Sequence, residues 1–209
     1  MLYGLVRAAF GFVVFLPIIL FVFIKPRIKT WRPVKSSTVW ISIAAVVFYA
    51  ALCYAPAENL FISFQSPQDV FSYTHAEKIK NVIYGDHSAM VSYASDASKT
   101  TSVFFPKSAT GYKIPWLGNA ARFVTSAINT NGVFQVFNVS GTSDYYVSGQ
   151  SVQNTSEVTI SDSNNSELKI TIEKADDTDY VVSFDGYINN FTSDYYLMIN
   201  GKKIGITSS

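Results

Sequence analysis

The stretch LYGLVRAAFGFVVFLPIILFVFI, residues Leu2–Ile24, decides how this chain is organised. From residue 8 onward the stretch contains no charged side chain. A helix rises about 1.5 Å per residue, so this stretch extends over roughly 34 Å, more than a hydrocarbon core of about 30 Å. The sequence therefore predicts a first transmembrane helix over residues 1–24.

A second apolar run, TVWISIAAVVFYAALCYA, occupies residues 38–55 and predicts a second transmembrane helix. Helices satisfy their own backbone hydrogen bonds, as any segment that crosses a bilayer must. The alternative is a pair of buried helices in a soluble core. We favour a membrane hairpin because a chain of 209 residues offers too little surface to bury both helices.

The segment between the two runs, residues 25–37, is short and basic, and it contains no acidic residue. Short loops rich in lysine and arginine stay on the cytoplasmic side of the plasma membrane. We therefore expect a cytoplasmic loop, two spans, and both termini on the extracytoplasmic side. The basic side chains expected to contact anionic lipid headgroups are Lys25, Arg27, Lys29, Arg32 and Lys35.

Charge is divided unevenly along the chain. Residues 1–57 carry six basic and no acidic side chains, a net charge of +6, and residues 58–209 carry ten basic and fifteen acidic ones, a net charge of −5. This division excludes a near-neutral soluble globule. It also excludes a nucleic-acid partner, because the positive charge lies between apolar runs instead of on an open face.

Signal-peptide cleavage is an alternative to the second span. In that interpretation the basic loop is an n-region, residues 38–52 are an h-region, and Ala55-Pro56-Ala57 is a small-x-small cleavage site. Cleavage after Ala57 would release a soluble domain. The apolar run is long for an h-region and a complete span precedes it, so we favour the hairpin and leave cleavage open.

The remaining residues predict an extracytoplasmic portion of two parts. Residues 56–128 predict a small α+β subdomain, in which Ser66, Pro67 and Asp69 provide the N-cap, the first position and an acid in the first turn of a short helix. Residues 129–209 predict a β-rich subdomain, because short alternating runs are separated by polar turns. Asn200-Gly201 predicts a tight hairpin. The fold class is α+β, with a two-helix transmembrane hairpin followed by a mostly antiparallel β domain with one short helix.

Part of this portion resembles a known unit. The pattern Ser66-Pro67-x-x-Val70-Phe71, then Gly85-Asp86-x-Ser88-Ala89-x-Val91-x-Tyr93, then Gly111-Tyr112-Lys113-Ile114 resembles a recurrent unit of uncharacterised exported or membrane-anchored proteins of Gram-positive bacteria, over residues 66–116. Tyr112 stands where that unit often has tryptophan. The resemblance implies an extracytoplasmic bacterial protein, and it transfers no active site.

Aromatic pairs are the candidate ligand-binding residues. Thr-Ser-Asp-Tyr-Tyr occurs at residues 142–146 and 192–196, either as a duplicated hairpin unit or by coincidence. Adjacent tyrosines in a strand point to opposite faces, so one ring of each pair is expected in the core and the other on the surface. Exposed rings suit sugars or a partner protein. The candidates are Tyr145, Tyr146, Tyr195, Tyr196 and Trp116.

A calcium site is the candidate metal centre, and otherwise we expect no cofactor. Asp162, Asn164, Ser166 and Glu173 occupy the first, third, fifth and twelfth positions of an EF-hand-like loop. The sixth position is Glu167 instead of glycine, and strands flank the loop. The alternative is a solvated turn.

No catalytic signature is present: the sequence has two histidines and no nucleophile elbow or phosphate-binding glycine loop. We therefore expect a membrane-anchored extracytoplasmic binding or interaction protein, not an enzyme, accessory to an envelope or membrane complex. The expected partners are the lipid bilayer, another membrane protein or a cell-envelope glycan. The alternatives are a hydrolase or transferase that acts on envelope polymers, and a structural spacer.

Overall fold

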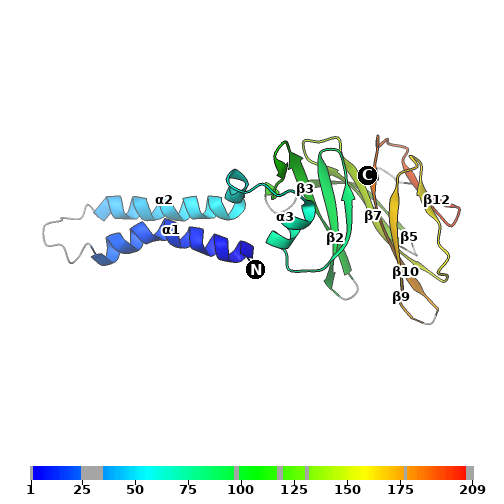
Figure 1. Cartoon of the computed structure of the whole chain (residues 1–209), viewed down its shortest axis with the longest axis horizontal. Helices are drawn as coiled ribbons and strands as arrows, with labels where there is room; N and C mark the ends of the chain where they lie inside the picture. Colours follow the sequence, from blue (N-terminus) through cyan, green and yellow to red (C-terminus); the bar gives the residue numbers. More distant parts are fainter. Residues whose placement is uncertain are drawn as a thin grey trace.

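The computed structural model describes residues 2–24, 35–96, 99–116, 120–129, 132–176 and 178–205. Two long helices lie side by side and project from one end of a β domain (Figure 1). The prediction of an α+β chain with mostly antiparallel sheets is confirmed. Of the predicted headgroup residues, Lys25, Arg27, Lys29 and Arg32 lie outside the described residues, and Lys35 begins the second helix.

Helices α1 (Leu2–Ile24) and α2 (Lys35–Tyr54) correspond to the two apolar runs. They approach closely at Gly11, where an added Cβ would lie 2.7 Å from Cε2 of Tyr49. The Tyr49 ring also meets Phe15 edge to face, with ring centroids 5.3 Å apart. Side chains are described for residues 3–16 and 40–51, and within the described residues no helix is long and apolar enough to cross a membrane.

The first sheet is antiparallel, with strand order β1-β2-β3-β4. Its strands are β1 (Ile79–Tyr84), β2 (Ser88–Asp96), β3 (Lys99–Ser108) and β4 (Gly111–Tyr112). Helix α3 (Pro67–Thr74) covers one face, and a short helix, η2 (Ala57–Leu60), precedes it. The predicted helix start is confirmed as a capping box, in which the Ser66 and Asp69 side chains each bind the other's backbone N–H.

The second sheet has the order β5-β6-β7-β10-β9 and the third β12-β11-β8. The second contains β5 (Ala121–Asn129), β6 (Gly132–Val139), β7 (Tyr145–Gln153), β9 (Leu168–Lys174) and β10 (Tyr180–Ile188), and the third β8 (Ile160–Asp162), β11 (Tyr196–Ile199) and β12 (Lys202–Gly205). Strand β5 pairs with β6, so it lies with the later strands, whereas the sequence predicts a subdomain boundary after residue 128. Asn200 and Gly201 both have positive φ and form the predicted hairpin turn.

Within the described residues, helix α3 and the three sheets form four layers, with a hydrophobic core between each neighbouring pair. Phe71 of α3 packs on the first sheet, Phe104 and Tyr146 fill the space between the first and second sheets, and Phe184 packs between the second and third. Strands of the second sheet serve two cores because successive side chains point to opposite faces. Tyr146 and Val147 accordingly belong to different cores.

An ion pair joins the hairpin to the β domain. The Arg7 guanidinium on α1 donates to both carboxylate oxygens of Glu58 on η2, at 2.8 and 3.1 Å, and to the carbonyl of Ala55 at 3.2 Å. Glu58 is only 2% exposed. One turn earlier on α1, the Tyr3 ring meets Tyr73 of α3 edge to face. The start of α1 is therefore held against the domain by a bidentate ion pair and by aromatic packing.

Candidate functional site

A buried carboxylate fastens the first sheet to the second. Asp144 lies between β6 and β7 and is fully buried. Its Oδ2 accepts hydrogen bonds from the backbone N–H of His87, at 2.8 Å, and from the Ser88 hydroxyl. Its Oδ1 accepts one from the Tyr187 hydroxyl at 3.3 Å, and the Ser88 and Tyr146 hydroxyl oxygens lie 2.9 Å apart. We call these five residues the Asp144 network.

The tyrosines of the Asp144 network keep their protons at neutral pH. Burial, together with the nearby carboxylates of Asp144 and Asp86, raises the pKa of Tyr187 to about 12. Burial is also the main reason that the pKa of Tyr146 lies well above its ordinary value. Both hydroxyl groups are thus available as donors. The network is suited to fixing the sheets together, not to proton transfer near neutral pH.

Gly85 allows the two sheets to approach each other at this point. A Cβ at Gly85 would lie 2.5 Å from the Tyr146 hydroxyl oxygen and 2.7 Å from Oδ2 of Asp144. Both distances are shorter than real Cβ contacts allow. The glycine of the β1–β2 turn is therefore needed for close approach to the Asp144 network.

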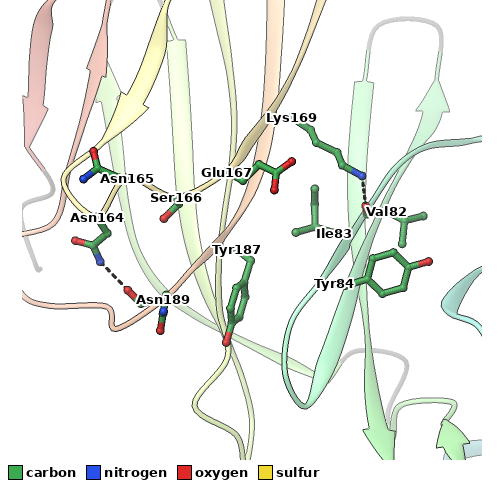
Figure 2. Close-up of a pocket in the computed structure, with 10 residues that line it drawn as sticks. All are labelled: Val82, Ile83, Tyr84, Asn164, Asn165, Ser166, Glu167, Lys169, Tyr187 and Asn189. Atoms are coloured by element: carbon green, nitrogen blue, oxygen red, sulfur yellow. Dashed lines mark hydrogen bonds between the residues drawn. The ribbon is translucent and has the colours of Figure 1, made fainter.

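Beside this network, a pocket of about 510 Å³ opens between the first and second sheets (Figure 2). One wall comes from β1, and the other from the β8–β9 turn, from β9 and from the end of β10. The lining contains one acidic and one basic side chain, so its formal charge is zero. The lining residues are Val82, Ile83, Tyr84, Asn164, Asn165, Ser166, Glu167, Lys169, Tyr187 and Asn189.

Hydrogen bonds hold the walls of the inter-sheet pocket, and Figure 2 shows two of them. Lys169 reaches across from β9, and its Nζ donates to the carbonyl of Val82 on β1 at 2.7 Å. The Asn164 amide donates to the carbonyl of Asn189 at 3.0 Å. The first bond ties the two sheets, and the second ties the β8–β9 turn to the end of β10.

Other polar groups of the pocket are left for a ligand. Within the described residues, the side chains of Asn165, Glu167 and Asn189 make no hydrogen bond, and all three residues are exposed. The Ser166 hydroxyl is buried and has no hydrogen-bond partner in the described part of the chain. The two exposed amides and the exposed carboxylate offer both donors and acceptors to a ligand, whereas the Ser166 hydroxyl is closed to solvent. A polar ligand without a large net charge would suit this set.

The aromatic candidates from the sequence do not form one site. Tyr146 and Tyr195 are both buried, in different cores. Tyr145 stacks on Phe191, with ring centroids 4.9 Å apart, and Lys203 Nζ lies 3.8 Å from the centroid of the half-buried Tyr196 ring. In the first pair the buried ring is the second tyrosine, Tyr146, whereas in the second pair it is the first tyrosine, Tyr195. The two five-residue segments therefore have different structures.

Trp116, the remaining aromatic candidate, is 69% exposed. It follows the segment that hydrogen bonds to Asn59 in the η2 helix, at the hairpin end of the domain. It does not line the inter-sheet pocket.

The calcium candidates are only partly brought together. Oδ1 of Asp162 accepts from the backbone N–H groups of Asn164, at 3.2 Å, and Ser166, at 2.7 Å, so it caps the turn. Glu173 lies farther along β9, where it pairs with Lys80 at 3.3 Å. Among the described residues no group of three or more His, Cys, Asp or Glu side chains could hold a metal ion.

Sequence reasoning missed most of the pocket and the central residue of the Asp144 network. Asn165, Glu167, Lys169 and Asn189 belong to the second sheet and its turns, and they meet β1 only because the sheets pack face to face. The local sequence carries no signal for that contact. Asp144 occurs within a quoted repeat, but burial distinguishes it from Asp194, which is exposed.

The fold and site define an α+β protein of stacked antiparallel sheets, with a helical hairpin at one end and a polar pocket between two sheets. No protein-family model, curated protein or solved structure matches the sequence. The resemblance over residues 66–116 stays an expectation. Function is therefore argued from the site itself.

Proposed function

We propose that this chain is a membrane-anchored extracytoplasmic protein whose β domain binds a neutral oligosaccharide in the inter-sheet pocket. The anchor is the α1–α2 hairpin, and the protein serves as an accessory to an envelope complex. Support for the anchor comes from the sequence of both apolar runs and from their exposed apolar side chains, among them Leu5 and Phe12 on α1 and Trp40 and Val47 on α2. Such a surface needs lipid or protein around it.

The orientation follows from charge. The basic segment between the helices favours the cytoplasmic side, which puts the β domain outside. The ion pair between Arg7 and Glu58 fits this arrangement, because it holds both outer helix ends at the domain. The net charge of −5 over residues 58–209 then describes the extracytoplasmic part.

The observation that carries the ligand class is the pocket lining. Ligand pockets usually measure about 300–1,000 Å³, and this pocket is about 510 Å³ in volume. Its formal charge is zero, and the side chains of Asn165, Asn189 and Glu167 are free to bind hydroxyl or acetamido groups. Tyr84, about half exposed, points to the α3 side of β1, where its hydroxyl hydrogen bonds to Gln68, so the polar side chains carry the proposal. Neutral, hydroxyl-rich molecules match this combination best.

Binding without cleavage is favoured over hydrolysis. Most glycoside hydrolases use two carboxyl groups on either side of the scissile bond. The described lining of the pocket contains one carboxylate, that of Glu167. We therefore propose a binding module, with hydrolysis as an outcome that the same experiment would detect.

The test is calorimetric titration of the full chain in lipid nanodiscs with chitotriose and, separately, cellotriose. We expect one of them to bind with Kd of about 0.1–1 mM. Replacing two free lining groups, Glu167→Ala with Asn189→Ala, should weaken binding by about tenfold or more, because each removes a hydrogen-bonding group. Exposed Asn154 and Glu157 lie outside the pocket, so Asn154→Ala with Glu157→Ala is the matched control.

Three outcomes would contradict the proposal. If neither sugar gives a heat of binding at millimolar concentration, a neutral oligosaccharide is not the ligand. If the control pair loses as much affinity as the pocket pair, the sugar does not bind in the inter-sheet pocket. Release of new reducing ends during the titration would mean that the protein is a hydrolase.

A further inference from the structure

The most exposed large apolar side chains of the β domain's first half gather on two segments. Leu60 and Phe61, in and just after η2, are 80% and 79% exposed. Trp116, just after the first sheet, is 69% exposed. We call these three residues the junction patch. Side chains of this size and exposure are unfavourable in water and indicate a surface that something apolar covers.

Asn59 holds the two segments of the junction patch together. Its side-chain Nδ2 donates to the carbonyl of Ile114 at 2.8 Å, and its Oδ1 accepts from the N–H of Ile114 at 2.9 Å. Lys113 Nζ adds a bond to the carbonyl of Asn59 at 3.2 Å. Leu60 is next to Asn59 in sequence, and Trp116 comes two residues after Ile114. The amide pair therefore holds together the two segments that carry the three apolar side chains.

This region lies where the hairpin meets the domain. Helix α2 ends at Tyr54, and η2 begins three residues later, between the hairpin and the β domain (Figure 1). Glu58 of η2 is paired with Arg7 of α1, so both helices are fixed at this level. Leu60 and Phe61 of the junction patch therefore follow the end of α2 within seven residues along the chain.

We propose that the junction patch inserts into the headgroup region of the outer leaflet of the bilayer. This inference rests on the proposed membrane anchor. A hairpin that enters the bilayer must bring residues 55–62 to its surface, and tryptophan is the side chain that favours this interface most. The patch then supplies a third contact with the membrane beside the two helices. This additional contact restrains the orientation of the β domain on the bilayer, and with it the direction in which the inter-sheet pocket opens.

Single-tryptophan fluorescence tests this inference, because the chain has three tryptophans, Trp31, Trp40 and Trp116. Trp31→Phe with Trp40→Phe leaves Trp116 as the reporter of the patch, and Trp31→Phe with Trp116→Phe leaves Trp40 as the reporter of the hairpin. Each full-length variant is reconstituted into phosphatidylcholine vesicles whose acyl chains carry bromine either near the headgroup or near the chain end. We expect Trp116 to be quenched about twofold more by the shallow bromine than by the deep one.

The two reporters separate this inference from the anchor on which it rests. If Trp40 is quenched but Trp116 is unquenched and emits as it would in water, the junction patch does not insert into the bilayer, although the anchor is supported. Absence of quenching at both positions would overturn both. In the Trp116 background, Leu60→Ser with Phe61→Ser should reduce quenching of Trp116 by about half or more, whereas Ile128→Ser, at an exposed residue of β5, should not change it. Equal effects of the two changes would also overturn the patch.

Discussion

Replacement of Asp144 by alanine is expected to lower the free energy of unfolding by about 4 kcal/mol. The carboxylate is fully buried and receives hydrogen bonds from the His87 N–H, the Ser88 hydroxyl and the Tyr187 hydroxyl. Alanine leaves the His87 N–H without this acceptor and takes one acceptor from the Ser88 and Tyr187 hydroxyls, which keep contacts with Tyr146 and Asp86. Each unsatisfied buried group costs about 1–3 kcal/mol. Urea unfolding of the full chain in nanodiscs, followed by near-ultraviolet circular dichroism of the tyrosines, measures the change.

The chain contains its own control for this experiment. Asp194 occupies the same position in the second Thr-Ser-Asp-Tyr-Tyr segment, but it is exposed. Asp194→Ala should therefore change the free energy of unfolding by less than about 0.5 kcal/mol. A loss of under about 1 kcal/mol for Asp144→Ala, or equal losses for the two variants, would contradict the role given to the Asp144 network.

Glu58→Ala should lower the free energy of local opening, where the hairpin meets the domain, by about 3 kcal/mol. The reason is that the largely buried Arg7 loses its carboxylate partner. The backbone N–H groups of Phe61 and Ile62 both donate to the carbonyl of Glu58, so they report local opening. Hydrogen exchange of the peptide that covers residues 57–66 should become about 100-fold faster.

Two further variants show whether the effect comes from the unpaired charge. Glu173→Ala removes the exposed ion pair with Lys80 and should leave exchange within about twofold of the original rate. Arg7→Met with Glu58→Leu replaces the buried pair by apolar side chains and should recover most of the protection. If Glu58→Ala accelerates exchange by less than about threefold, the ion pair between Arg7 and Glu58 does not hold the hairpin to the domain.

Local features of the fold could be predicted from the sequence. The two long helices follow from the uninterrupted apolar runs, although their place in a membrane stays a prediction. Helix α3 follows from Ser66, Pro67 and Asp69, which act within one turn of each other. The β11–β12 hairpin follows from Asn200-Gly201, where both residues need positive φ. In each case the physical cause lies within a few residues of the effect.

Features that depend on contacts between sheets could not be predicted. Asp144 and His87 are 57 residues apart in the chain, and Lys169 and Val82 are 87 apart. The same five-residue sequence occurs at residues 142–146 and 192–196. The second tyrosine is buried in the first copy and the first tyrosine in the second copy. Arg7 likewise resembles an isolated charge in an apolar run until the chain returns and places Glu58 beside it.

The central claim is that the hairpin crosses a membrane and presents the β domain outside. Thiol accessibility on intact cells tests it most directly, since Cys53 is the only cysteine and Cys53→Ser supplies a cysteine-free background. In that background, Ser193→Cys in the β domain should react with a membrane-impermeant thiol reagent on intact cells. Ser36→Cys, next to the basic segment, should react only after permeabilisation. Labelling of Ser36→Cys on intact cells, or protection of Ser193→Cys until the cells are opened, would contradict the account.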